Sequence, residues 1–454
     1  MNQDLTQGSI TGTMLLFALP MIAGNLLQQA YNVADTLIVG QFLGADALAA
    51  VGSAYTLMTF LTSVLLGLCM GSGVLFSICR GQGDGARLRR GVAVSFGLVG
   101  AAALALNLAV FLAIDPILRF LQAPERVYGL MRDYLWLVFW GIGATFLYNF
   151  CASLLRAVGN SAVPLLFLAI SAAGNIVLDL FFVLVLDWGV KGAAAATALA
   201  QWASGIGILA YTKLKFPELC PSCAECRWDG GSAKEILRLS SLTCLQQSVM
   251  NFGILLVQGR VNSFGPAVMA AFAAAVKIDS FAYMPVQDFG NAFSTFTAQN
   301  FGARKQERIR QGIRSAAACA MVFCALVSTA VCVFARPLMR LFVKAHETEI
   351  LSIGVRYLRI EGAFYWGIGL LFLLYGLYRA VGRPGMSVVL TVISLGTRVV
   401  LAYALSAIPA VGVTGIWVSV PVGWVLADAA GVLYYRKHRA RLLSLQPSEN
   451  RFFA

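Results

Sequence analysis

The sequence predicts an all-α polytopic membrane protein with twelve membrane-spanning helices in two pseudo-twofold related six-helix lobes. Three observations support this fold class: an apolar composition, apolar runs long enough to cross a bilayer, and an internal repeat. Of 454 residues, 59% are hydrophobic and only 12% are charged, whereas soluble globular chains carry about 25% charged residues. Too few charges are present to cover a soluble surface of this size. This excludes a soluble enzyme or nucleic-acid-binding protein, and no nucleic acid partner is expected.

The apolar runs define the spans, because a bilayer core of about 30 Å requires about 20 apolar residues in a helix. We expect spans at 14–40, 47–78, 91–114, 133–156, 161–186, 190–212, 237–259, 266–298, 312–335, 357–380, 384–408 and 411–435. The first run is expected to be a retained helix, since Asp4 and no basic residue precede it. The resulting divisions are an N-lobe at 1–212, a cytoplasmic linker at 213–236, a C-lobe at 237–435 and a basic cytoplasmic tail at 436–454.

Basic residues predict the orientation, because Lys and Arg are retained on the cytoplasmic side of the membrane. With the N-terminus inside, 22 of the 34 Lys and Arg fall in cytoplasmic connections and 10 in outer ones. The remaining two, Lys277 and Arg398, fall within spans. We therefore expect a multi-pass protein of the cell (cytoplasmic) membrane with both termini in the cytoplasm.

An internal repeat divides the chain into two halves. Leu154–Gly159 recurs as Leu377–Gly382 at an offset of 223, and the same offset pairs Gly189 with Gly412. Six spans per half is an even number, so both halves enter the membrane from the same side. Two such lobes around a central cavity suit transport by alternating access, in which a rocking motion exposes one site to each side in turn.

Acidic residues in the first half are candidates for a function, because they do not recur in the second half as packing residues would. The first-half residues Asp35, Asn175, Asp179 and Thr197 correspond to Gly253, Arg398, Ala402 and Val420. At about 1.5 Å per residue, Asp35, Asp179 and Thr197 share a depth of about 7–10 Å from the outer ends of their spans. Asn175 and Asp179, four residues apart, project from one helix face. The sequence therefore predicts a polar cluster in the N-lobe.

The chemistry of this cluster follows from its oxygen atoms. Two carboxylates, an amide carbonyl and a hydroxyl are hard ligands suited to Na⁺. They could equally take protons, since burial disfavours a charged carboxylate. The alternative is that both Asp residues only hydrogen-bond neighbouring helices. No cofactor is expected beyond a coupling H⁺ or Na⁺.

Several motifs together resemble the multidrug and toxic compound extrusion (MATE) family, in particular its bacterial and archaeal DinF-like branch. They are Gly44–Gly52, Lys277–Asp279, Gln299–Arg304 and Arg156–Gly159 with Pro164. The resemblance implies a secondary active antiporter that exports amphiphilic, often cationic organic compounds in exchange for H⁺ or Na⁺. It places the coupling cation at Asp35, Asn175, Asp179 and Thr197, and a bend of the first helix at Pro20. A proline also weakens the helix ladder by its missing N–H.

Other candidates have two readings each. Asn149, Tyr31 and Gln28 could line the cavity and contact substrate, whereas a helix–helix hydrogen bond or interfacial anchoring are the alternatives. Lys277, Asp279 and Arg398 could form a charge network in the C-lobe, with structural pairing preferred over substrate contact. Asp428 in the last span is open to the same two readings.

Cys220, Cys223 and Cys226 follow a C-x₂-C-x₂-C spacing in the linker. Three thiolates could hold zinc, but no fourth ligand is nearby, so free thiols are expected. No catalytic constellation or nucleotide-binding loop is present, which predicts a non-enzymatic protein driven by an ion gradient.

The alternatives to drug export are a lipid-linked oligosaccharide flippase and a metabolite exporter of the same superfamily. A flippase would require several Lys or Arg in the cavity, and only Lys277 and Arg398 lie well inside the spans, away from their ends. A major-facilitator transporter is disfavoured because residues 81–90 do not match its loop motif, and a channel because the polar residues are confined to one lobe. We expect a monomer in the lipid bilayer with small organic substrates.

Overall fold

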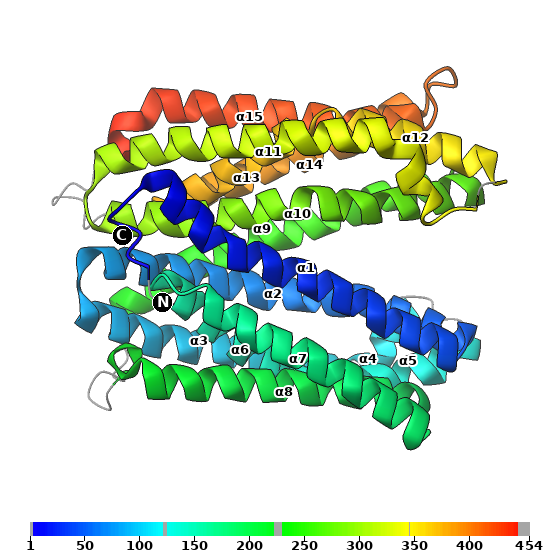
Figure 1. The fold of residues 1–454 in the computed structure, drawn as a ribbon, viewed down its shortest axis with the longest axis horizontal. Coiled ribbons are helices and arrows are strands. Elements are labelled where there is room, and N and C mark those ends of the chain that lie inside the picture. The colour runs from blue at the N-terminus through cyan, green and yellow to red at the C-terminus, as the bar shows by residue number, and fades with distance from the viewer. Residues whose placement is uncertain (1–2, 121–124, 222–228, 345, 444–454) are drawn as a thin grey trace. The chain divides into compact units, whose positions relative to one another are not determined.

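A computed structural model describes residues 3–120, 125–221, 229–344 and 346–443. All regular secondary structure in these residues is helical. The helices form two compact units (Figure 1). Unit 1 comprises Leu19–Cys244 together with the described residues before Leu5, and unit 2 comprises Leu5–Ala18 together with the described residues from Leu245 onward.

Fifteen α-helices and three short helical segments are named in chain order. The first half contains α1 (Ile10–Phe42), α2 (Ala45–Gln82), α3 (Gly85–Leu112), α4 (Ile114–Phe120), α5 (Glu125–Val138), η1 (Phe139–Gly141), α6 (Ile142–Ala157), α7 (Ala162–Leu180), η2 (Phe181–Val185), α8 (Gly189–Lys215) and η3 (Pro217–Leu219). The second half contains α9 (Gly230–Asn262), α10 (Pro266–Gly302), α11 (Gln306–Arg340), α12 (Thr348–Gly362), α13 (Tyr365–Ala380), α14 (Pro384–Ser406) and α15 (Thr414–Leu443).

The predicted fold class is confirmed: the chain is a polytopic bundle of long apolar helices. By length and composition, ten helices among the described residues can cross a membrane, or eleven if the bent pair α12 and α13 counts as one span. Twelve spans were expected. The predicted span 237–259 lies within α9, which is long enough but carries Lys234, Glu235 and Arg238 in its first turns. These charges and later glutamines dilute its apolar character.

Two helices begin eight or nine residues earlier than predicted. α5 begins at Glu125 rather than at 133, and α12 begins at Thr348 rather than at 357. Both have a charged face and a buried apolar face, so an apolar run alone does not reveal their first turns. α12 and α13 meet at an angle of 50°.

The unit boundaries differ from the predicted lobes because α1 and α9 are continuous helices that each belong to two units. α1 passes from unit 2 to unit 1 after Ala18, and α9 passes from unit 1 to unit 2 after Cys244. The predicted C-lobe started at 237. Within unit 2, the segment Leu5–Gly8 is anchored by three side chains: Asn300, Lys305 and Arg308 donate hydrogen bonds to its backbone carbonyls.

The repeat is visible in the backbone. Gly159 and Gly382, which follow α6 and α13, have positive φ angles of 89° and 72°. Gly189 and Gly412, which the same offset pairs, have φ angles of 57° and 52°. Only glycine adopts this left-handed region readily. The matched glycines therefore preserve the same turns in both halves.

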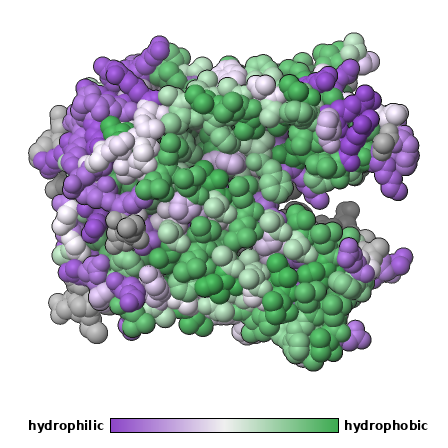
Figure 2. All heavy atoms as spheres, in the orientation of Figure 1, coloured by the Kyte–Doolittle hydropathy of each residue, from purple (hydrophilic) through white to green (hydrophobic). Residues whose placement is uncertain are grey.

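Large apolar side chains remain exposed along the helices, as the hydrophobic band on the surface shows (Figure 2). Examples are Leu104 in α3, Val177 in α7 and Leu326 in α11. Hydrophilic side chains gather toward the helix ends in the same view. Exposed apolar surface of this extent is stable only against lipid, so the surface is that of a protein embedded in a membrane.

Candidate functional site

Two carboxyl groups meet in unit 1. Asp35 of α1 and Asp179 of α7 lie at hydrogen-bonding distance of each other. The Asp179 side chain is fully buried, and Asp35 is partly buried. Asp35 Oδ1 and Asp179 Oδ1 are both buried without a hydrogen-bond donor. Two carboxylate oxygens in contact require a positive charge between them, because an ionised carboxylate only accepts hydrogen bonds.

Asn175 and Thr197 complete this group, which we name the unit 1 cluster. With the amide nitrogen of Asn175 turned toward Asp179, it donates to Asp179 Oδ2 at 2.9 Å, and its oxygen accepts from the Thr197 backbone N–H at 3.1 Å. The opposite amide orientation leaves only a 3.4 Å contact to Thr197 Oγ1. Both residues are buried. The first orientation satisfies both neighbours and fixes one oxygen of Asp179.

Local structure explains how α7 presents these residues. Asn175 and Asp179 are one helical turn apart and therefore share a face. Directly after Asp179, the helix widens into the π-helical turn η2, and Phe182 in this turn stacks on Trp188 at 5.0 Å between ring centroids. Single π-helical turns interrupt helices frequently at functional sites. The turn holds the end of α7 in place beside the start of α8.

The donor set fits a proton or a small hard cation. It offers two carboxyl groups and the Thr197 hydroxyl, oxygen ligands of the type that bind Na⁺, while Asn175 holds one Asp179 oxygen through its amide nitrogen. The two unpartnered carboxyl oxygens are an observation that both cations would explain. A single proton shared by the two carboxyl groups would join their oxygens by one hydrogen bond. A metal ion would instead contact both oxygens directly.

The structure also places the other first-half candidates. Pro20 lies inside α1, whose helix continues through it to Phe42. Gln28 is exposed and Tyr31 is partly buried; with Asp35 they follow the i, i+3, i+7 spacing of one helix face. Asn149 donates to the Thr145 carbonyl of its own helix at 2.9 Å. This hydrogen bond lies within α6.

In unit 2, the expected charge network has different members. Asp279 of α10 is buried and accepts hydrogen bonds from Tyr357 Oη at 2.6 Å and from Tyr365 Oη. Glu361 is also buried, and its side chain interacts with that of Asp279. Arg398 faces both carboxyl groups from α14 without forming an ion pair within the described residues. Lys277 is exposed and takes no part in these contacts.

Sequence reasoning missed Tyr357, Glu361 and Tyr365. Their spacing of four residues would place all three on one face of an uninterrupted helix, and that pattern is the signal in the sequence. The break between α12 and α13 lies between Glu361 and Tyr365, so Asp279 bonds to residues on both sides of the bend. The Tyr357 ring packs against Phe272 and Trp417, which orients its hydroxyl.

Two further sequence candidates can be placed. Asp428 is buried in α15 with neither oxygen hydrogen-bonded within the described residues. Cys220 follows η3, whereas Cys223 and Cys226 lie outside the described residues. No group of three metal-ligating side chains occurs in the part of the chain that the structure describes.

Comparison with known proteins agrees with this architecture. The model of the MatE family matches residues 20–181 and 240–404. The chain is 31% identical to the probable multidrug resistance protein YpnP of Bacillus subtilis, over 97% of this chain and 98% of the relative. It is 24% identical to a FAD transporter of Shewanella oneidensis, over 96% of each chain. A MOP superfamily transporter from Pyrococcus furiosus superposes with a TM-score of 0.90 at 23% identity, covering 97% of this chain and 98% of that one.

The chain therefore belongs to the MATE family of multidrug efflux transporters. This is a family of multi-span membrane transporters, and it is not an enzyme class.

Proposed function

We propose that the protein is a secondary active multidrug antiporter that exports amphiphilic, often cationic organic compounds in exchange for H⁺ or Na⁺. The observation that supports this proposal is the interaction between Asp35 and Asp179, two carboxyl groups that each keep a buried oxygen without a hydrogen-bond donor. A cation entering from outside neutralises the pair and joins α1 to α7. Its release restores the repulsion between them.

Pro20 gives α1 a point at which it can respond. A helix is weakened at a proline because the proline ring displaces a backbone hydrogen bond. Loss of the bound cation separates Asp35 from Asp179, α1 bends at Pro20, and the affinity for the organic substrate changes. We place the chain in the cell's cytoplasmic membrane with both termini inside, following the distribution of Lys and Arg. It acts as a monomer, without a cofactor.

Export of a metabolite is the second candidate function. It is supported by one relative, the FAD transporter of Shewanella oneidensis, which is similar over nearly the whole chain. The coupling step would be the same for either substrate. The two candidates differ only in which compound moves against the cation.

The test uses the full chain in reconstituted vesicles loaded with a fluorescent organic cation, under a pH gradient or, separately, a Na⁺ gradient. We expect one gradient to drive native transport, and Asp35→Asn and Asp179→Asn to abolish it. Asp115→Asn, which removes a surface carboxylate in α4, is the matched control and should transport normally. Persistent driven transport in both cluster variants would refute coupling at this site and direct attention to Asp279. Transport of FAD instead of the organic cation would favour the second candidate.

A further inference from the structure

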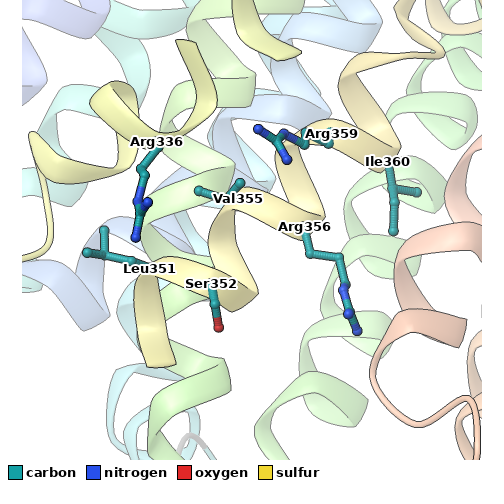
Figure 3. Close-up of a pocket in the computed structure, with 7 residues that line it drawn as sticks. All are labelled: Arg336, Leu351, Ser352, Val355, Arg356, Arg359 and Ile360. Atoms are coloured by element: carbon teal, nitrogen blue, oxygen red, sulfur yellow. The ribbon is translucent and has the colours of Figure 1, made fainter. Parts of the chain in front are cut away.

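A hollow of about 420 Å³ lies between the end of α11 and the outer face of α12 (Figure 3). Three arginines border it: Arg336 projects from α11, and Arg356 and Arg359 project from neighbouring turns of α12. The rest of its lining is mainly apolar, with Leu351, Val355, Ile360 and the single hydroxyl of Ser352. The combination of guanidinium groups and an apolar floor suits an amphiphilic anion.

The positive charge at this hollow is not balanced. No described carboxylate forms an ion pair with Arg336, Arg356 or Arg359, and Arg356 donates only to the Thr414 hydroxyl at 3.3 Å. The equivalent end of unit 1 is different, since three of its basic residues have acidic partners. These are Arg126 with Asp46 at 2.8 Å, Arg132 with Asp115 at 3.0 Å and Lys191 with Asp133 at 3.3 Å.

The arginines also depart from the expected charge distribution. Five of the ten basic residues that the orientation assigns to outer connections fall within 336–359. Basic residues are disfavoured on that side, so a local excess there requires a reason. Antiport at the unit 1 cluster does not use them.

The hollow lies at the depth in the membrane at which lipid phosphate groups are found. Arg314 and Arg336 lie 22 residues apart on α11, which corresponds to about 33 Å along a helix. This is slightly more than the hydrocarbon core of about 30 Å. Arg336 therefore lies at the headgroup layer of the leaflet opposite Arg314, which the predicted orientation makes the outer leaflet.

An apolar stripe leads to the hollow from the membrane side. Val322, Leu326 and Val333 of α11 are 61%, 67% and 64% exposed, and their spacing of four and seven residues places them on one face. Arg336 follows Val333 by three residues, just beyond a kink of α11 at Phe334. A lipid whose phosphate contacts Arg336 would have its acyl chains beside this stripe.

We propose that the hollow binds the phosphate group of an anionic outer-leaflet phospholipid. The planar guanidinium of arginine donates two parallel hydrogen bonds to a phosphate, and Arg336 and Arg359 supply two such groups from different helices. A lipid with an additional cationic headgroup is less favoured, because its ammonium would meet the same arginines. Bound lipid would bridge α11 and α12 beside the bend that carries Glu361.

The test measures lipid binding to the detergent-purified full chain by native mass spectrometry. The probes are phosphatidylglycerol, phosphatidylcholine with the same chains, and glycerol 1-phosphate, which has the headgroup without the chains. We expect phosphatidylglycerol to bind most tightly, and Arg336→Gln with Arg359→Gln to weaken it roughly tenfold or more, the effect of losing about 1.4 kcal/mol. The control is Arg126→Gln with Arg132→Gln, which also removes two positive charges but in unit 1. This control should leave lipid binding unchanged.

A conservative variant separates binding from folding. Arg336→Lys with Arg359→Lys keeps the charge and should retain more lipid than the Gln pair. Unchanged phosphatidylglycerol binding by a folded Gln pair would overturn the proposal. Equal binding of phosphatidylcholine would overturn the selectivity for an anionic lipid. Glycerol 1-phosphate binding as tightly as the lipid would show a site for a soluble anion and would also overturn it.

Discussion

The carboxyl groups of Asp35 in α1 and Asp179 in α7 contact each other, and each keeps a buried oxygen without a donor. Two ionised carboxylates about 4 Å apart would repel each other by about 4 kcal/mol at an effective dielectric constant of about 20. Binding one positive charge removes this repulsion. The contact therefore makes the relative position of two helices dependent on a cation.

Replacing Asn175 should weaken the cation site. Its amide donates to Asp179 Oδ2 and ties that carboxyl to Thr197. A hydrogen bond to a charged group contributes about 1.5–3 kcal/mol, so Asn175→Ala should raise the cation concentration for half-maximal transport roughly tenfold or more. Asn262→Ala serves as the control, because Asn262 is an exposed amide at the end of α9, and should transport as the native chain does. An unshifted cation dependence in Asn175→Ala would count against its place in the site.

Removing either tyrosine hydroxyl at Asp279 should destabilise unit 2. Tyr357→Phe and Tyr365→Phe each delete a donor to a buried carboxyl, at a cost of about 1–3 kcal/mol. Because both share one acceptor, the double variant should not equal the sum of the single variants. Thermal unfolding in detergent measures these changes, with Tyr403→Phe, whose side chain is half exposed, as the control. Stabilities equal to that of the control would contradict the role of Asp279 in holding α12 and α13 at their bend.

Arg87→Met should lower stability by about 1–3 kcal/mol near neutral pH. Arg87 forms two hydrogen bonds, at 2.9 and 3.1 Å, to the buried Glu235 at the start of α9. Without Arg87 the carboxyl loses its counter-charge. Arg80→Met removes an equally positive but exposed side chain and should have little effect.

The effect of Arg87→Met should depend on pH. Burial raises the pKa of Glu235 above its ordinary value of 4.5, and the Arg87 guanidinium opposes this rise. In the variant the folded-state pKa rises further, while the unfolded-state value is unchanged. At low pH Glu235 is protonated in the native chain and in the variant, so the variant loses no electrostatic stability there. The loss of stability grows as pH rises above the folded-state pKa of Glu235 in the native chain, because only the variant then carries an unpaired buried carboxylate. Unfolding scans at about pH 5 and pH 8 should show the larger deficit at pH 8, and the reverse order would contradict this account.

Gly71→Ala should disrupt the packing of α2 against α9. A Cβ atom at Gly71 would lie 2.4 Å from the backbone Cα of Ser240, so the two helices would have to separate. Ser72 and Ser240 also hydrogen-bond at 3.1 Å beside this contact. Gly97→Ala is the control, since nothing lies within 4 Å of its added Cβ and alanine favours helix. A folded Gly71→Ala protein with native stability would contradict this close contact.

Helix content and the repeat could be predicted because both depend on local pattern. Apolar runs located the spans, and the matched glycines Gly159 and Gly382 adopt the same left-handed turn. Depth along each helix also brought Asp35, Asp179 and Thr197 to one level, where the structure places them in one cluster. Their role in coupling stays a prediction.

The group that Asp279 forms with Tyr357, Glu361 and Tyr365 in unit 2 could not be predicted in the same way. Glu361 lies between Arg359 and the bend after Gly362, in a stretch that looks like the charged end of a span. Its burial depends on the rotation of α12 toward α10, which one sequence does not specify. Lys277 is two residues from Asp279 and therefore lies on the opposite face of α10. Because α10 buries the face that carries Asp279, Lys277 is exposed.

The most direct test of the central claim is the cation flux that substrate movement drives. Vesicles containing the full chain are given a gradient of organic cation alone, and internal pH or Na⁺ is recorded with an indicator dye. Downhill substrate flux through the native chain should drive H⁺ or Na⁺ in the opposite direction, and Asp179→Asn should eliminate that cation flux. An equal cation flux in the native chain and in Asp179→Asn would contradict coupling at the Asp35 and Asp179 pair.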